Sequence, residues 1–397
     1  MTERTSKRFI VSYRIGDFPH AGLKLLPWDV APCDGVLINA YDFLKNGRTL
    51  RYAKRLLEEP DPLSSLKLPR DLILDSGAYY FVRSNTADID PAQIVELAVT
   101  LGVPHVVTLD HPFPPGQTVE EIDRRIGTTA ANTASMAEAL NARCSSVPSL
   151  IPALHGHDEV TLLKSYNSQP QIRDSKTTKV GVGSLAPLAQ KGAMRDAAEA
   201  MILAREILED KHMHVFSVGS PLLMHFAFLC GADSVDSQSW MMSAAFKQAH
   251  LPGLAQMRLS SREREQSADA YDARRRIFEQ QLLKLQLEEG FEVKDWDTGA
   301  IMCLRDEKDA QAYTDQLEDG TQGNRVHWRA CHNLAVGTFE ARRMTSELDS
   351  GAVATFLMSR HKIGPYRAVM NEVIEKLIKK GLLCKEHRPR CSDKPEQ

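Results

Sequence analysis

Residues 214–237, HVFSVGSPLLMHFAFLCGADSVDS, indicate the fold because they contain a strand, a turn, a helix and a second strand in succession. The first residues are β-branched and aromatic, which favours a strand, and a Gly-Ser-Pro turn beginning at Gly219 ends that strand. An apolar helix over 222–230 follows and ends at Gly231. The second strand brings Asp236 to its C-terminal end, which is where catalytic side chains gather if parallel strands close into a barrel.

The chain contains eight short apolar runs, most of them near-continuous, which is typical of parallel strands covered on both faces. They are residues 9–13, 36–41, 72–75, 105–110, 149–154, 179–182, 214–218 and 232–236. Amphipathic helical patterns lie between them, at 90–102, 118–140 and 193–210. The repeated strand-helix order predicts an α/β fold, a (β/α)8 TIM barrel. A doubly wound open sheet is the alternative, because periodicity does not show closure.

The pattern changes after Asp236. Residues 260–290 predict a long polar helix, 291–304 a short irregular or β insertion, and 328–348 and 365–383 two further amphipathic helices. We therefore expect two parts. The catalytic barrel would span residues 1–258, and a helical C-terminal region that includes the last barrel helices would span residues 259–397.

Length and composition fit one large globular domain with an appendage. The chain has 397 residues, 43% of them hydrophobic and 25% charged. No apolar run reaches the roughly 18 residues that a membrane span needs, and the first residues lack the apolar core of a signal peptide. Seven scattered cysteines predict reduced thiols, so we expect a cytoplasmic protein without a membrane partner.

The formal net charge of −3 excludes a protein that coats nucleic acid through its overall charge. Any contact with nucleic acid must then come from local basic stretches, of which there are two. One contains Arg274, Arg275 and Arg276, which we predict to bind nucleic acid, and the other runs through residues 360–390. The alternative is that both are solvated helix faces, as charge runs usually are.

Polar residues follow several predicted strands at the point where each strand ends. They are Asp75-Ser76-Gly77, Asp110, His155-Gly156-His157 and Asp236, with Gly183-Ser184 as a further, backbone-rich site. A carboxylate has no packing reason to end a buried strand, and in a barrel these ends converge on one mouth. The alternative is that each Asp only caps the following helix, which is less plausible when three occur together.

Two carboxylates that face each other across a pocket suit displacement at an acetal-like carbon. One attacks and forms a covalent ester, while the other moves a proton on or off the leaving group. Burial and mutual repulsion push the two pKa values apart, which separates the roles. We predict that Asp236 is the nucleophile and Asp75 the acid/base, acting on a glycosidic bond such as that of a nucleoside.

Six short motifs together resemble the tRNA-guanine transglycosylase family. They are LDSGAYYF (74–81), TLDHPFPP (108–115), ALHGH (153–157), VGVGSLAP (180–187), SVGSP (217–221) and GADSVDS (231–237). The matches come in the family's order and align both acids. The resemblance implies a (β/α)8 barrel and a glycosyltransferase of the pentosyltransferase class, which exchanges guanine in a nucleic acid for a 7-deazaguanine base.

The resemblance also implies roles for the site residues. Asp236 would attack C1′ of an extruded nucleotide and expel guanine, and Asp75 would protonate that guanine and then deprotonate the incoming base. His155 stands where the family has a Gln that reads the base, with a satisfied histidine at the barrel rim as the alternative. The implied substrate-binding set is Asp110, His155, Gly183, Ser184, Ser76 and Gly77.

The C-terminal region departs from the family's zinc motif. Cys303 and His332 stand in plausible ligand positions, but Ile301 and Asp306 replace the other two thiolates, and Ile cannot bind a metal. We therefore expect no metal and no other cofactor, with Cys303 and His332 as weak zinc candidates. A loose cluster in the tail is expected to be chance: Cys384, His387 and Cys391.

The altered base pocket, the lost zinc motif and the ending GADSVDSQSW (231–240) resemble family relatives that place a preQ0-like 7-deazaguanine in DNA beside restriction-modification proteins. We therefore predict a DNA-guanine transglycosylase that works by double displacement. Its partners would be DNA, the 7-deazaguanine base and proteins of a DNA-modification system. The alternatives are tRNA as the nucleic acid, a non-catalytic base- or nucleic-acid-binding paralogue subunit, and a hydrolase that releases the base to water.

Overall fold

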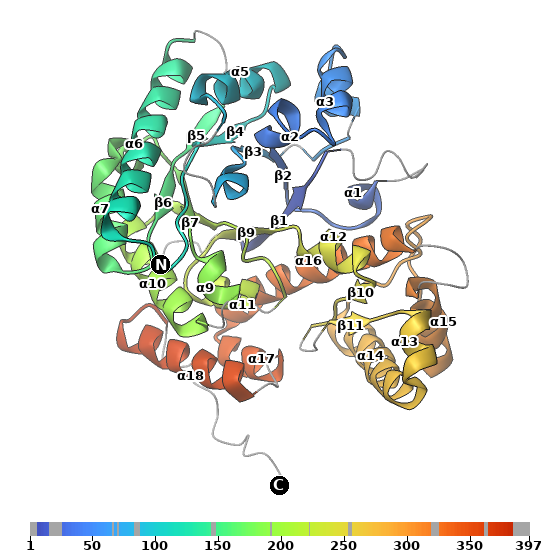
Figure 1. The fold of residues 1–397 in the computed structure, drawn as a ribbon. Helices are drawn as coiled ribbons and strands as arrows, with labels where there is room; N and C mark the ends of the chain where they lie inside the picture. Colours follow the sequence, from blue (N-terminus) through green and yellow to red (C-terminus); the bar gives the residue numbers. More distant parts are fainter. Residues whose placement is uncertain are drawn as a thin grey trace.

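The computed structural model describes residues 6–15, 26–65, 67–69, 71–82, 88–143, 148–190, 193–221, 223–252, 256–318, 325–360 and 364–383. Within these residues the centre is one parallel sheet of nine strand segments (Figure 1). They are β1 (Arg8–Tyr13), β2 (Val36–Asn39), β3 (Leu72–Asp75), β4 (His105–Val107), β5 (Ser149–Ile151), β6 (Ala153–His155), β7 (Lys179–Gly183), β8 (His212–Val215) and β9 (Ser234–Ser237). All eight predicted apolar runs are therefore strands.

The sheet forms a barrel because one run contributes to both of its edges. The strand order is β5-β4-β3-β2-β1-β9-β8-β7-β6, with β5 paired to β4 and β6 paired to β7. Only Pro152 separates β5 from β6, and its carbonyl accepts a hydrogen bond from the Gly181 N–H at 2.9 Å. The ring is closed except for the break at this proline, which lacks an N–H. The predicted TIM barrel is confirmed, and the open-sheet alternative is wrong.

Alternate residues of each strand point into the barrel. On β1 to β5 five of them form a small apolar cluster: Ile10, Leu37, Ile73, Val107 and Ile151. The Phe216 ring packs against this cluster, and Gly181 leaves room for the ring because a Cβ there would overlap it. The residues between them, such as Phe9 and Leu74, face outward and join the larger core under the helices.

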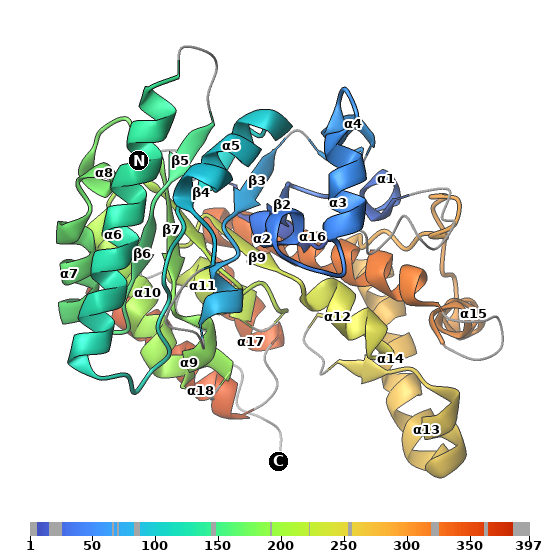
Figure 2. The ribbon, with the colours of Figure 1, turned by 45° about the horizontal axis from the view of Figure 1, so that its top comes forward.

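Helices surround the sheet (Figures 1 and 2). Up to residue 245 they are α1 (Pro27–Val30), α2 (Ala40–Leu44), α3 (Leu50–Leu57), α4 (Pro62–Ser65), α5 (Pro91–Leu101), α6 (Val119–Asn141), α7 (Glu159–Ser168), α8 (Pro170–Arg173), α9 (Ala186–Gln190), α10 (Met194–Leu208), α11 (Leu223–Leu229) and α12 (Ser239–Ala245), with the 3-10 helix η2 (Ala78–Phe81). Helix α5 has the predicted ends. Asp90 caps it by accepting the Ala92 N–H at 2.8 Å, and Gly102 ends it with φ +66°.

The C-terminal region returns to the barrel. Its elements are β10 (Gln248–Ala249), β11 (Met257–Arg258), α13 (Ser261–Gln266), α14 (Ala268–Glu289), α15 (Glu307–Leu317), α16 (Val326–Ser350), α17 (Val353–Arg360) and α18 (Gly364–Lys379). The predicted helix 260–290 is two helices that meet at Ser267. Helix α16 packs on β1, where a Cβ at Gly337 would lie 2.9 Å from the Phe9 ring. None of the described helices is long and apolar enough to cross a membrane.

Candidate active site

A cavity of about 510 Å³ opens at the C-terminal ends of the strands. The ends of β3, β4, β6, β7 and β9 bring six of the predicted residues to its wall: Asp75, Asp110, His155, Gly183, Ser184 and Asp236. Two predicted residues, Ser76 and Gly77, act on this wall through hydrogen bonds to its carboxylates. Residues from distant parts of the sequence thus converge as the barrel geometry requires.

Asp75 is the inward residue at the end of β3. Its Oδ2 accepts the Gly77 N–H at 3.1 Å and the Asn39 side-chain amide at 3.2 Å. Gly77 adopts φ +90°, and a Cβ there would overlap the Asn39 amide oxygen, so the turn requires glycine. Burial, reinforced by the charges of Asp110 and Asp236, raises the pKa of Asp75 to about 8. The carboxyl group therefore holds a proton at neutral pH and can donate it.

Asp236 is the inward residue near the end of β9, and it is 4% exposed. The Ser217 N–H donates to its Oδ1 at 2.8 Å, and His214 Nε2 lies 3.4 Å from the same oxygen. Ser217 adopts φ +60°, and the neighbouring Gly219 N–H donates to the Asp236 carbonyl at 2.9 Å. A Cβ at Gly219 would lie 2.8 Å from that carbonyl oxygen. The Gly-Ser-Pro turn is thus shaped to hold the strand that carries Asp236.

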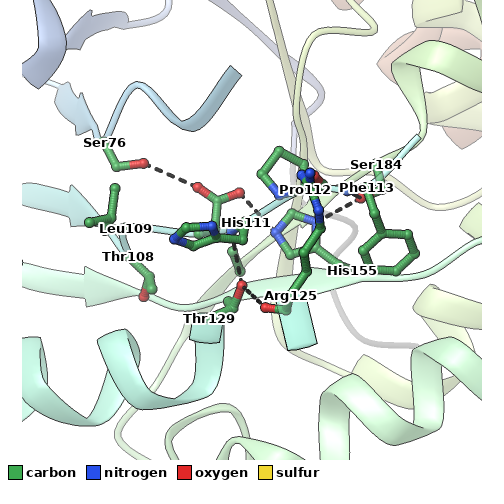
Figure 3. Close-up of polar contacts among 12 residues, drawn as sticks. Ser76, Thr108, Leu109, His111, Pro112, Phe113, Arg125, Thr129, His155 and Ser184 are labelled. Atoms are coloured by element: carbon green, nitrogen blue, oxygen red, sulfur yellow. Dashed lines mark hydrogen bonds and ion pairs between the residues drawn. The ribbon is translucent and has the colours of Figure 1, made fainter. Parts of the chain in front are cut away.

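Asp110 and His155 form a buried pair beside these two acids. His155 Nε2 lies 2.8 Å from Asp110 Oδ2, and Ser76 donates through its hydroxyl to Asp110 Oδ1 at 3.1 Å. Figure 3 shows His155 with Ser184 and Phe113 on one side and Ser76 on the other. A Cβ at Gly183 would overlap the His155 ring, so glycine is required where β7 passes it. The pair presents carboxylate and imidazole groups that can bind the polar edge of a nucleobase.

Ser184 holds the strand ends of β6 and β7 together. Its hydroxyl lies 3.1 Å from His155 Nδ1 and accepts the Phe113 N–H at 3.0 Å, while its carbonyl lies 2.9 Å from His157 Nε2. It adopts φ +67°, an uncommon conformation for a serine. Backbone strain of this kind persists only where several contacts enforce it, and here the contacts of the Ser184 hydroxyl and carbonyl hold the residue in place.

Several cavity residues were not predicted from the sequence. Asn39 ends its strand in the same way as Asp75, so the strand-end signal could have found it. Phe216, just after β8, lines the cavity, and His214 lies below it beside Asp236; both follow from the alternation of inward residues along β8, which becomes visible only when the strand's register is known. Arg14 is the one Lys or Arg among the described residues that line the cavity.

One of the three arginines predicted to bind nucleic acid lies in the interior. Arg275 is 4% exposed, and three carboxylates surround its guanidinium: Glu279 at 2.6 Å, Glu318 at 3.0 Å and Asp315 at 2.5 Å. A group held in this way stabilises the α14–α15 packing and is not available to a phosphate, so the prediction is wrong for Arg275. Arg274 and Arg276 are exposed, and the prediction stands for both.

The weak zinc candidates do not fit a metal site. His332 is buried, with Nδ1 2.9 Å from the Tyr313 hydroxyl and Nε2 2.8 Å from the His250 carbonyl, so both ring nitrogens are engaged. The Trp296 indole N–H donates to the same Tyr313 hydroxyl at 2.7 Å. The described part of the chain holds no group of three or more His, Cys, Asp or Glu that could bind a metal ion. The cluster Cys384, His387 and Cys391 lies outside the described residues.

Comparison with known proteins gives one family. The family model described as queuine tRNA-ribosyltransferase matches residues 48–362. The tRNA-guanine(15) transglycosylase of Methanocaldococcus jannaschii is 23% identical over 217 residues, which is 53% of this chain and 31% of that protein. Those of Thermococcus onnurineus and Pyrobaculum aerophilum are 26% and 27% identical over 175 and 181 residues, covering 43% and 44% of this chain and 28% and 34% of theirs. The matched part spans about a third of the length of these relatives.

Proposed function

The chain belongs to the queuine tRNA-ribosyltransferase family, and from this premise we propose that it is a guanine transglycosylase. It would exchange a guanine base of a nucleic acid for another purine-like base, with a 7-deazaguanine as the incoming base. The relatives named above act on guanine in tRNA by their names, which favours tRNA, the alternative substrate of the sequence prediction, over DNA.

The observation that carries the proposal is the pair Asp75 and Asp236 on one cavity wall. Burial, together with the charges of Asp110 and Asp236, raises the pKa of Asp75, so this carboxyl group holds a proton at neutral pH. Asp75 can then donate a proton to the leaving base, and Asp236 would supply the oxygen that attacks. This is the division of labour that a double displacement needs.

The first half-reaction breaks the glycosidic bond of the target nucleotide. Asp236 Oδ2 attacks C1′, because both contacts described for this carboxylate occupy Oδ1. The bond from C1′ to guanine N9 breaks, its electron pair goes to the base, and Asp75 supplies the proton that makes guanine a neutral leaving group. An ester between C1′ and Asp236 remains.

The second half-reaction reverses these steps with a new base. Asp75, now a carboxylate, removes the proton from the incoming base, whose N9 attacks C1′ and releases Asp236. Asp110 and His155 line the same cavity as both acids and would read the edge of whichever base is bound. Two inversions at C1′ keep the β-configuration of the nucleotide.

A specific observation keeps DNA as the second candidate. Tyr313 and the His250 carbonyl occupy both nitrogens of His332, where the family resemblance implies a zinc ligand of the tRNA-directed members. A chain with a different C-terminal region can have a different polynucleotide partner. Proteins of a DNA-modification system remain partners only within this second proposal.

The test is incubation of the purified protein with radiolabelled guanine in two parallel reactions, one containing tRNA and the other duplex DNA. Label in tRNA supports the first proposal, and label in duplex DNA alone supports the second. Asp236→Asn is the control, and it should incorporate no label into either polymer. Release of free guanine without incorporation would mean a hydrolase, and stable binding without either product would mean a non-catalytic subunit.

A further inference from the structure

A column of polar side chains lies inside the barrel below Asp236. His212 and His214 are alternate residues of β8, Ser234 and Asp236 are alternate residues of β9, and the strand register places His214 beside Ser234. His214 is 0% exposed and Ser234 is 2% exposed. Polar groups this deep require hydrogen bonds to offset the loss of water.

Two imidazoles share the single hydroxyl of Ser234. His212 Nε2 and His214 Nδ1 each lie 2.8 Å from Ser234 Oγ. A hydroxyl has one proton, so it can donate to only one ring and must accept an N–H from the other. Burial lowers the pKa of His212 to about 3, which leaves that ring neutral with one N–H to place. The hydrogen bonds of the column can therefore run in only one of two directions, from His212 through Ser234 to His214 or the reverse.

The charge of Asp236 selects between the two directions. If His214 Nδ1 donated to Ser234, the lone pair of Nε2 would face the Asp236 carboxylate at 3.4 Å, which is repulsive. If Ser234 donates to His214 Nδ1, the proton of His214 sits on Nε2, the atom that lies 3.4 Å from Asp236 Oδ1. In that arrangement His212 Nε2–H donates to Ser234, and the buried Nε2–H of His214, which has no hydrogen-bond partner among the described residues, lies next to the Asp236 carboxylate and can be attracted by it.

We infer that His214 is a positioning residue for the nucleophile. His212 and Ser234 hold its ring in the Nε2–H form, and this N–H acts together with the Ser217 N–H on Asp236 Oδ1, so that Oδ2 faces the sugar carbon. This inference rests on the proposed function for its consequence in catalysis, but the tautomer of His214 can be measured without any substrate.

The first experiment determines the tautomer. Nitrogen-15 NMR of protein labelled at histidine separates Nε2–H from Nδ1–H rings, and the His214 signals are those that His214→Gln removes. We expect His214 to be Nε2–H in the unmodified protein and a mixture of both forms in Ser234→Ala. A pure Nδ1–H ring overturns the inference, whatever the protein does to nucleic acid.

The second experiment separates hydrogen bonding from packing. Gln can place an amide N–H near the position of Nε2, whereas Phe fills the space without a donor. His214→Phe should lower the rate of covalent adduct formation with nucleic acid roughly 10- to 100-fold, the usual effect of one hydrogen bond to a charged group, with KM unchanged. His214→Gln should stay within a few-fold of the unmodified protein. Equal rates for the two variants overturn the inference.

A second buried histidine beside a carboxylate gives the matched control. His225 is 1% exposed, and its Nε2 lies 3.0 Å from Glu340, away from the cavity. His225→Phe should lower thermal stability without slowing adduct formation in the folded fraction. If the unmodified protein forms no adduct with tRNA or DNA, the proposed function fails, and the NMR result still decides the arrangement of the column.

Discussion

The two sides of the barrel interior have opposite chemistry. On β1 to β5 the inward side chains are apolar: Ile10, Leu37, Ile73, Val107 and Ile151. On β8 and β9 they are His212, Ser234, His214 and Asp236, joined by contacts of 2.8 to 3.4 Å. Burying a methylene stabilises the fold, whereas burying a polar group does so only weakly even when it is paired. The difference shows which side of the barrel is built for stability and which side is built to hold a reactive group.

Removing the nucleophile, which lies on the polar side of the barrel, should give the largest loss of exchange activity. Asp236→Asn keeps the size and the hydrogen-bonding capacity of the side chain but cannot form the ester. We expect exchange to fall on the order of 10⁴-fold or more and the covalent adduct to disappear. Denaturing gel electrophoresis after incubation with labelled nucleic acid measures the adduct. Persistence of the adduct would place the attacking group elsewhere.

Changing the acid should separate activity from stability. Asp75→Asn removes the proton donor, so we expect kcat to fall roughly 10²- to 10⁴-fold. In the unmodified protein, kcat should also fall as pH rises through about 8, since Asp75 then loses its proton before the first half-reaction. A pH–rate profile in a mixed buffer measures this.

The same variant should be more stable than the unmodified protein at high pH. The pKa of Asp75 is about 8 in the folded chain and about 3.9 in an unfolded one, so between these values the folded form binds the extra proton. The contribution of this proton to the free energy of unfolding is complete below about pH 4 and is lost as pH rises towards 8. Asn titrates in neither state, so the melting temperature of Asp75→Asn minus that of the unmodified protein should be larger at pH 8.5 than at pH 5. An equal difference at both pH values would contradict the raised pKa.

A substitution on the apolar side should affect stability without affecting chemistry. Ile73→Ala removes a buried side chain from the small interior cluster and should lower the free energy of unfolding by roughly 2–5 kcal/mol. Urea denaturation measures this. Exchange per folded molecule should be unchanged at 25 °C, because Ile73 is below the cavity and absent from its lining. A large fall in kcat would show that the two sides are less separate than their contacts indicate.

The exposed arginines should give a small effect, limited to binding. Arg274→Ala combined with Arg276→Ala should weaken nucleic-acid binding several-fold and reduce its salt dependence by up to about two phosphate contacts. Arg275 is the contrasting neighbour, because its removal should break a buried ion cluster and lower stability by roughly 3–5 kcal/mol. Binding titrations at several salt concentrations measure the effect of the double variant. Unchanged binding would mean that Arg274 and Arg276 only contact solvent.

Removing metal should have no effect. Of the ligand positions implied by the family, His332 has both ring nitrogens engaged by Tyr313 and the His250 carbonyl, and Ile301 cannot bind a metal. Treatment with a chelator should therefore leave the melting temperature unchanged, whereas Tyr313→Phe should lower stability by about 1–3 kcal/mol because it removes the partner of His332. A drop in melting temperature with chelator that zinc restores would contradict this.

The sequence predicted the strands well because a buried parallel strand is apolar on both faces, and such runs are visible without tertiary information. It also predicted the acids, since Asp75, Asp110 and Asp236 each interrupt such a run. The sequence did not predict the polar column. His212 and His214 alternate with Met213 and Val215, and the direction in which each pair faces is known only from the strand register. Arg275 shows the reverse problem: three consecutive arginines on a helix differ in exposure, and sequence alone does not identify the one that faces inward.

The contact between α16 and β1 has a consequence for the order of events during synthesis. The outer face of β1 is covered by a helix that begins more than 300 residues later, where Gly337 meets Phe9 and Thr345 accepts the Lys7 N–H. While the ribosome is still translating the middle of the chain, the first strand has no permanent cover. Shortening the gene after residue 258 would therefore keep all nine barrel strands but remove α16, which leaves the apolar outer face of β1 exposed, and such a fragment should require a chaperone or precipitate.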